Sequence, residues 1–248
     1  MSDAPETSAE LPFLAHLVEL RERLLRAVAA VMAVFLLCLP FANRIYALLA
    51  KPLLDKMPAG TKMIAIEVAS PFLTPLKLTF FLAVFLAMPY LLFQAWAFVA
   101  PGLYRHERRL ATPLLFSSVV LFYTGCAFAY FLVLPAVFAF LQAVAPVGVA
   151  VMTDISQYLD FVLVLFLAFG LCFEVPVAVV ILVLLGWVTP AQLREARGYV
   201  VVGAFVVAAV LTPPDIVSQL LLAIPMCFLY EIGILASGWL PKRVEATN

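Results

Sequence analysis

One carboxylic acid, Glu174, lies in an otherwise uncharged stretch that extends from Asp160 to Arg194. The residues on either side of it, LCF and VPVAVVILVLLG, are apolar, and the stretch is long enough to cross a bilayer as a helix. An ionised acid at the centre of a spanning helix costs about 2.5–3.5 kcal/mol on insertion scales, so such acids face a protein interior or a wet cavity. The sequence therefore predicts a membrane-spanning helix with a functional polar position.

Composition extends this prediction to the whole chain. Hydrophobic residues make up 66% of the sequence, against about 45–50% in soluble domains. We expect an all-α integral membrane protein, one domain over residues 1–248, with several helices bent by interior prolines such as Pro89, Pro135, Pro176 and Pro225. Its six predicted transmembrane helices span about 24–42, 72–98, 113–141, 158–185, 199–211 and 216–238, after a cytoplasmic amphipathic segment, 1–23.

Two apolar blocks leave an alternative open. No charge occurs between Leu110 and Thr153, so this stretch has room for two spans. We count one, because the sequence AVAPVGVAVMT after Gln142 is short and contains Pro146 and Gly148. The fifth block is short before the turn TPPD, so a re-entrant hairpin competes with a short span there.

Lysine and arginine set the expected orientation, since short cytoplasmic loops carry more of them. With six spans, ten of the 15 basic residues fall on the side of both termini and five on the other side. Trp96, Trp187 and Trp239 fall at span ends on the first side, where amphipathic rings prefer the headgroup layer. Both termini are therefore expected in the cytoplasm.

Several functional classes lack the residues that their chemistry requires. The net charge is zero, which gives no reason to expect nucleic acid. Neither His16 nor His106 has a second ligand at metal spacing, and no HExxH or phosphate-binding lysine motif occurs. We expect no metal, no cofactor and no enzymatic activity. A proton-coupled secondary transporter that uses Glu174 and Asp215 is the alternative, without the inverted repeat typical of that class, and a membrane protease is weaker still.

Two charged segments lie on the predicted cytoplasmic side. The segment LPFLAHLVELRERLL, residues 11–25, places His16, Glu19 and Arg23 on one helical stripe, with Glu19 and Arg23 at the i,i+4 spacing of helical ion pairs. The segment APGLYRHERR, residues 100–109, contains one acid, Glu107, among basic neighbours. From spacing alone, ion pairing and loop electrostatics account for both acids.

Five motifs considered together resemble those of a known family. They are HLVELRERLL at 16–25, ASPF at 69–72, APGLYRHERR at 100–109, FEVP at 173–176 and LTPPD at 211–215. In order and spacing they are similar to the motifs of the TatC family, the multispanning receptor subunit of the twin-arginine protein translocase. The resemblance implies a cup-shaped protein of the bacterial cytoplasmic (inner) membrane that exports folded proteins, driven by the proton-motive force.

The resemblance also implies a site for twin-arginine signal peptides. Glu19 and Glu107 match the family's two acidic positions, and the expected site also includes Arg21, Phe98, Tyr104 and Arg105 around them. The two acids would meet the consecutive arginines of the peptide, the basic residues would hold the acids, and the aromatic rings would shield them. A guanidinium presents a planar fork that can bond a carboxylate through two N–H groups, which a lysine ammonium lacks.

Other matching positions imply further contacts. Glu174 would face the concave side of the protein and meet part of the inserted signal peptide. Thr212, Asp215 and Gln219 fall where the family binds its single-span partner subunits TatA and TatB, although a turn residue after two prolines explains Asp215 by itself. Self-association within the complex is also implied.

Overall fold

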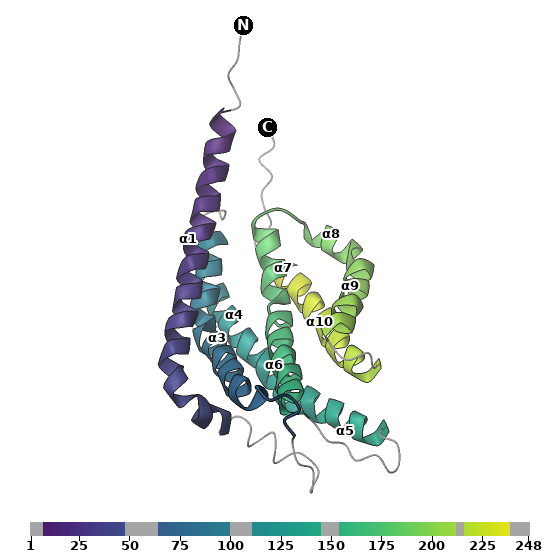
Figure 1. Ribbon diagram of the computed structural model, residues 1–248. Helices are drawn as coiled ribbons and strands as arrows, with labels where there is room; N and C mark the ends of the chain where they lie inside the picture. The colour runs from purple at the N-terminus through teal and green to yellow at the C-terminus, as the bar shows by residue number, and fades with distance from the viewer. Residues whose placement is uncertain (1–6, 48–63, 100–110, 145–153, 212–215, 239–248) are drawn as a thin grey trace. The chain divides into compact units, whose positions relative to one another are not determined.

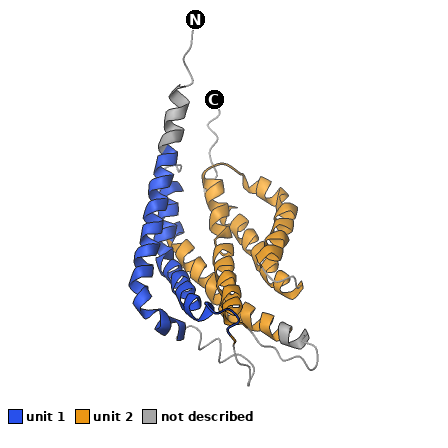
Figure 2. Ribbon diagram, viewed as in Figure 1, with its two compact units in different colours: residues 1–61, 65–115 blue, residues 62–64, 116–248 orange. Residues whose placement is uncertain are grey.

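The computed structural model describes residues 7–47, 64–99, 111–144, 154–211 and 216–238. In chain order its main helices are α1 (Thr7–Cys38), α3 (Ser70–Val99), α4 (Ala111–Phe128), α5 (Leu134–Val144), α6 (Ile155–Cys172), α7 (Val175–Leu184), α8 (Pro190–Glu195), α9 (Arg197–Leu211) and α10 (Ile216–Gly238) (Figure 1). The chain divides into two compact units, unit 1 (residues 1–61 and 65–115) and unit 2 (residues 62–64 and 116–248) (Figure 2).

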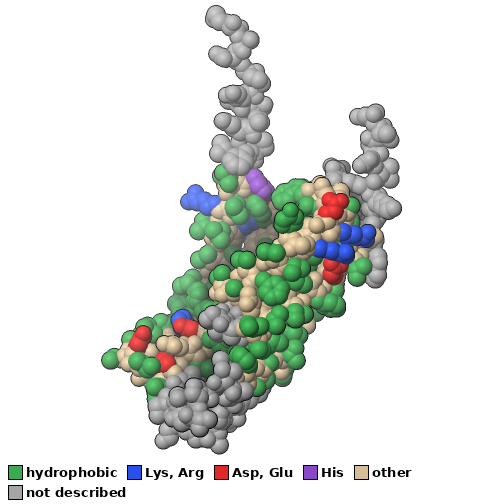
Figure 3. Space-filling model, turned by 90° about the vertical axis from the view of Figure 1, so that its right-hand side faces the viewer, with side chains coloured by type: hydrophobic (Ala, Val, Ile, Leu, Met, Phe, Trp, Pro, Cys, Tyr) green, Lys and Arg blue, Asp and Glu red, His purple; other side chains and the backbone are tan. Residues whose placement is uncertain are grey.

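Among the described residues, five helical runs are long and apolar enough to cross a membrane: His16–Ala47, Ser70–Val99, Ala111–Phe140, Ile155–Leu184 and Ile216–Gly238. A shorter apolar helix, α9, corresponds to the short fifth block. Within the described ranges the regular structure is helical apart from one isolated bridge. On the face drawn in Figure 3, hydrophobic side chains are spread over the described surface. The predicted all-α membrane fold is confirmed.

Unit 1 is built on α1 and α3, which pack against each other (Figure 1). Val31 of α1 and the small residues Ala83 and Ala87 of α3 are buried. Small residues are common where membrane helices pack together. The amphipathic segment and the first span form one continuous helix in the described residues, because nothing in LVELRERLLRAVAAV interrupts the helical pattern. Many large apolar side chains of α1 face outward, as lipid contact requires.

Unit 2 packs aromatic rings against glycines. The fully buried ring of Phe122 covers Gly170, where an added Cβ would lie 2.5 Å from a ring carbon. An added Cβ at Gly125 would lie 2.5 Å from the Phe169 carbonyl oxygen and 2.9 Å from the Phe173 ring. Apolar lipid provides no hydrophobic force between membrane helices, so their association depends on close packing. Small residues at helix crossings allow this close approach.

Two prolines of unit 2 lie where the chain departs from regular α-helix. The predicted span at 158–185 corresponds to one helical run, Ile155–Leu184, which is interrupted at Phe173 and Glu174. There α6 ends at Cys172 and Pro176 occupies the first turn of α7, where a missing N–H costs nothing. Pro135 follows the wider turns of the π-helix η4 (Ala129–Val133). A wider turn relieves the clash between a proline ring and the carbonyl four residues earlier.

The helices α8, α9 and α10 of unit 2 contact one another. The side chain of Thr189 caps α8 by accepting from the Gln192 N–H. The buried Tyr230 hydroxyl of α10 donates to the Leu193 carbonyl oxygen of α8 at 2.8 Å. Glu231 makes a solvent-exposed ion pair with Arg197 of α9, at 2.7 Å.

The glycine contacts predict a strong asymmetry between two equivalent substitutions. Gly125→Ala should destabilise the protein by about 2 kcal/mol, because the new methyl group meets backbone that cannot rotate away. Gly203→Ala in α9 should leave stability unchanged or slightly raised, because an added Cβ there meets nothing within 4 Å. Thermal unfolding of both variants in one detergent measures the difference, and equal stabilities would contradict the packing described here.

Candidate functional site

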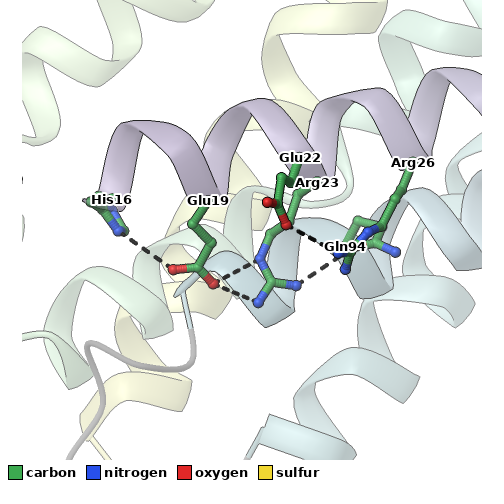
Figure 4. Close-up of polar contacts among 6 residues, drawn as sticks. All are labelled: His16, Glu19, Glu22, Arg23, Arg26 and Gln94. Carbon is green, nitrogen blue, oxygen red and sulfur yellow. Dashed lines mark hydrogen bonds and ion pairs between the residues drawn. The ribbon is translucent and has the colours of Figure 1, made fainter. Parts of the chain in front are cut away.

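The candidate site lies in unit 1, where the polar stripe of α1 faces α3 (Figure 4). Arg23 donates to one oxygen of Glu19, Oε1, from both Nε (2.9 Å) and Nη2 (2.6 Å). The side chains are 21% exposed for Arg23 and 34% for Glu19. This ion pair is therefore partly shielded from water, where a bond between charged groups is stronger than at an exposed surface.

A second contact joins the same guanidinium to α3. Arg23 Nη1 lies 3.5 Å from Oε1 of Gln94, a residue that is only 6% exposed (Figure 4). The i,i+4 spacing of Gln94 and Phe98 places them on one face of α3. The guanidinium of Arg23 therefore bridges the two helices.

The other oxygen of Glu19 faces a histidine. His16 Nδ1 is 3.9 Å from Glu19 Oε2, beyond hydrogen-bonding distance. The His16 ring stacks on Phe98, with ring centroids 4.2 Å apart and an interplanar angle of 20°. His16 therefore lies between Phe98 and Glu19, and the stacked rings form an aromatic surface beside the carboxylate.

The predicted signal-peptide residues differ in how far the structure describes them. Glu19 and Phe98 belong to unit 1 and are connected through His16. Arg21 is exposed on α1, and the residue that binds Glu19 is Arg23. Glu107, Tyr104 and Arg105 lie outside the described residues, as do Thr212 and Asp215.

Glu174, the predicted intramembrane acid, lies at the break between α6 and α7 in unit 2. Its Oε2 accepts a hydrogen bond of 2.6 Å from the hydroxyl of Ser118, a buried residue of α4. Its Oε1 is buried and has no hydrogen-bond partner among the residues that the structure describes. Glu174 thus has an acceptor oxygen left for a further donor.

Gln219, the predicted partner-interface residue on α10, is engaged within unit 2. Its Nε2 donates to the carbonyl oxygen of Phe205 in α9, at 3.1 Å. This hydrogen bond links the short helix α9 to α10, which pack against each other. Such bonds between membrane helices are worth about 0.6 kcal/mol on average, so packing provides most of the cohesion.

Sequence reasoning missed Gln94 and Ser118. Gln94 has a visible signal, since it is the one amide in the apolar segment TFFLAVFLAMPYLLFQAW. Ser118 has almost none, because serine is common in membrane helices and its partner Glu174 is 56 residues away. Among the described residues, no group of three histidines, cysteines or acids is arranged to hold a metal ion.

The chain is similar to proteins of known identity over most of its length. Residues 15–225 match the family model "Sec-independent protein translocase protein (TatC)". A Sec-independent protein translocase protein TatC from Azotobacter chroococcum mcd 1 is 56% identical over 99% of this chain and 96% of the relative. The TatC of Escherichia coli strain K12 is 57% identical over 91% of this chain and 88% of the relative.

Solved structures lead to the same family. A crystal structure of the twin-arginine translocase receptor TatC matches with a TM-score of 0.79 and 36% identity, over 90% of this chain and 98% of that one. The same receptor in the detergent DDM matches with a TM-score of 0.80. These similarities do not support the alternative of a proton-coupled transporter. The chain belongs to the TatC family and is a membrane component of a Sec-independent protein translocase.

Proposed function

We propose that this chain is the receptor for twin-arginine signal peptides, and that Glu19 and Glu107 together bind the two arginines. The observation that carries the proposal is the environment of Glu19, an acid 34% exposed between two helices and bordered by the stacked rings of His16 and Phe98. A partly desolvated carboxylate discriminates between cations better than one in open water, where an ion pair is worth about 0–1 kcal/mol.

The chemistry of arginine suits this site. Glu19 Oε2 has lone pairs available, and a planar guanidinium can donate to it while its flat face lies against an aromatic ring. A lysine ammonium can make the ion pair but lacks the fork. Arg21 and Arg105 would orient the two acids, and Tyr104 would shield them beside Phe98.

The partner subunits in this proposal are the single-span proteins TatA and TatB. The positions assigned to them are Thr212, Asp215 and Gln219, and they follow the short helix α9, which has exposed valines, in the sequence. A short apolar helix such as α9 is shorter than the hydrocarbon layer of the bilayer is thick. Association with a neighbouring helix is one way to accommodate this mismatch. Self-association of the chain would occur in the same complex.

The membrane in this proposal is the bacterial inner membrane, with both termini in the cytoplasm. The distribution of basic residues supports this orientation. With this orientation, Glu19 would lie on the cytoplasmic side, where a precursor arrives. Folded proteins would cross with the proton-motive force as the energy source, and the chain would act as a transport subunit without catalytic activity of its own.

The proposal is tested by crosslinking the purified chain to two signal peptides that differ only in having Arg-Arg or Lys-Lys at the same positions. We expect efficient crosslinking of the twin-arginine peptide and much weaker crosslinking of the twin-lysine peptide. Equal crosslinking of both would mean that the site attracts positive charge without recognising guanidinium groups, and would overturn the proposal.

A further inference from the structure

The ion pair between Glu19 and Arg23 uses one side of the carboxylate. Two nitrogens of Arg23 donate to the same oxygen, Oε1, at 2.9 and 2.6 Å. His16 Nδ1 lies 3.9 Å from the other oxygen, Oε2. The internal arginine therefore holds Glu19 firmly and still leaves one oxygen for an incoming donor.

Gln94 explains why Arg23 keeps this arrangement. The third nitrogen of the guanidinium, Nη1, lies 3.5 Å from the buried amide oxygen of Gln94 on α3 (Figure 4). If the guanidinium moved away from α3, Nη1 would leave Gln94. The amide oxygen would then lose a hydrogen bond in a buried position, which is unfavourable.

We propose that Arg23 and Gln94 are positioning residues that orient the Glu19 carboxylate, so that Oε2 is presented to the ligand's guanidinium. This inference rests on the proposed function and adds to it the origin of the preference for arginine over lysine. A fork-shaped guanidinium gains affinity from a carboxylate whose direction is already fixed, because less freedom is lost on binding. A lysine ammonium binds as a point charge and gains little from such orientation.

Two variants separate positioning from charge. Gln94→Met keeps the length and volume of the side chain and removes the amide oxygen. Arg23→Lys keeps the positive charge and removes the planar fork that reaches Glu19 and Gln94 together. The matched control is Arg26→Lys, since Arg26 is also paired at i,i+4, with Glu22, but both side chains are more than half exposed.

The readout is the ratio of affinities for the twin-arginine and twin-lysine peptides, measured for each full-length variant in one low-salt buffer. We expect Gln94→Met and Arg23→Lys each to lower this ratio about three- to tenfold, the effect of weakening bonds to a charged group. The loss should fall on the twin-arginine peptide, and Arg26→Lys should keep the parent ratio.

The outcomes distinguish this inference from the function on which it rests. A parent chain that does not prefer the twin-arginine peptide would refute the proposed function itself. A parent that does prefer it, with an unchanged ratio in both variants, would overturn the positioning role alone. Equal losses for both peptides would also overturn it, because they indicate general damage to α1 and α3. If Gln94→Met does not fold, as thermal unfolding would show, Arg23→Lys decides the question.

Discussion

Glu19→Gln should bind a twin-arginine signal peptide about tenfold more weakly than the parent chain, the expected cost of losing a partly shielded, charge-assisted hydrogen bond. The neutral amide retains one acceptor oxygen but no charge to attract the guanidinium. It also weakens the internal bonds from Arg23, both of which end on Glu19 Oε1. Fluorescence anisotropy of a labelled peptide, with the protein in detergent at fixed low salt, measures the affinity.

Glu22→Gln is the matched control for this substitution. Glu22 lies one turn along the same helix and pairs with Arg26 at 3.1 Å, but its side chain is 59% exposed. The change in charge is identical and the position is close, so general attraction to the membrane face falls equally in both variants. We expect less than about a twofold change, as is usual for an exposed pair. Equal losses from the two variants would leave Glu19 with no specific role.

Ser118→Ala should lower the stability of the protein by about 3 kcal/mol, because it removes the donor to Glu174 Oε2 and leaves a carboxyl group buried with less hydrogen bonding. Glu174→Gln should cost much less, since the amide oxygen can still accept from Ser118. Thermal unfolding in detergent is the measurement. Thr124→Val on the same helix is the control, because its hydroxyl bonds the Val120 carbonyl at an exposed position.

The double variant Ser118→Ala/Glu174→Leu gives this prediction a second test. Removing one partner leaves the other unsatisfied, whereas removing both leaves an apolar contact that can be nearly neutral. We therefore expect the double variant to be more stable than Ser118→Ala alone. If the double variant were as unstable as the sum of its parts, the hydrogen bond would not be the cause of the loss.

The helices could be predicted from sequence because each depends on its own residues. An apolar block of about 20 residues crosses a bilayer as an α-helix, because a helix satisfies its own backbone hydrogen bonds. The Glu19–Arg23 ion pair follows from i,i+4 spacing and is present. Pro176 shows a limit of local patterns. Proline suits both a bent helix and the first turn of a new one, and Pro176 occupies the second kind of position.

Contacts between helices could not be predicted in the same way. The approach of Arg23 to Gln94 depends on how far α1 is shifted along α3, which no local periodicity specifies. The bond between Ser118 and Glu174 depends equally on the arrangement of α4 against the α6–α7 break. The pairing of Glu19 with Glu107 stays a prediction from the resemblance, because Glu107 lies outside the described residues.

The most direct test of the account is the double-mutant cycle of Glu19→Gln and Glu107→Gln, read out as affinity for a twin-arginine peptide in a fixed low-salt buffer. If the two acids hold one ligand, the first loss already loosens it, and the double variant should lose less binding free energy than the sum of the two single losses. Strictly additive losses that are equally large with a twin-lysine peptide would contradict a shared guanidinium site, and would leave only a general acidic attraction at the membrane surface.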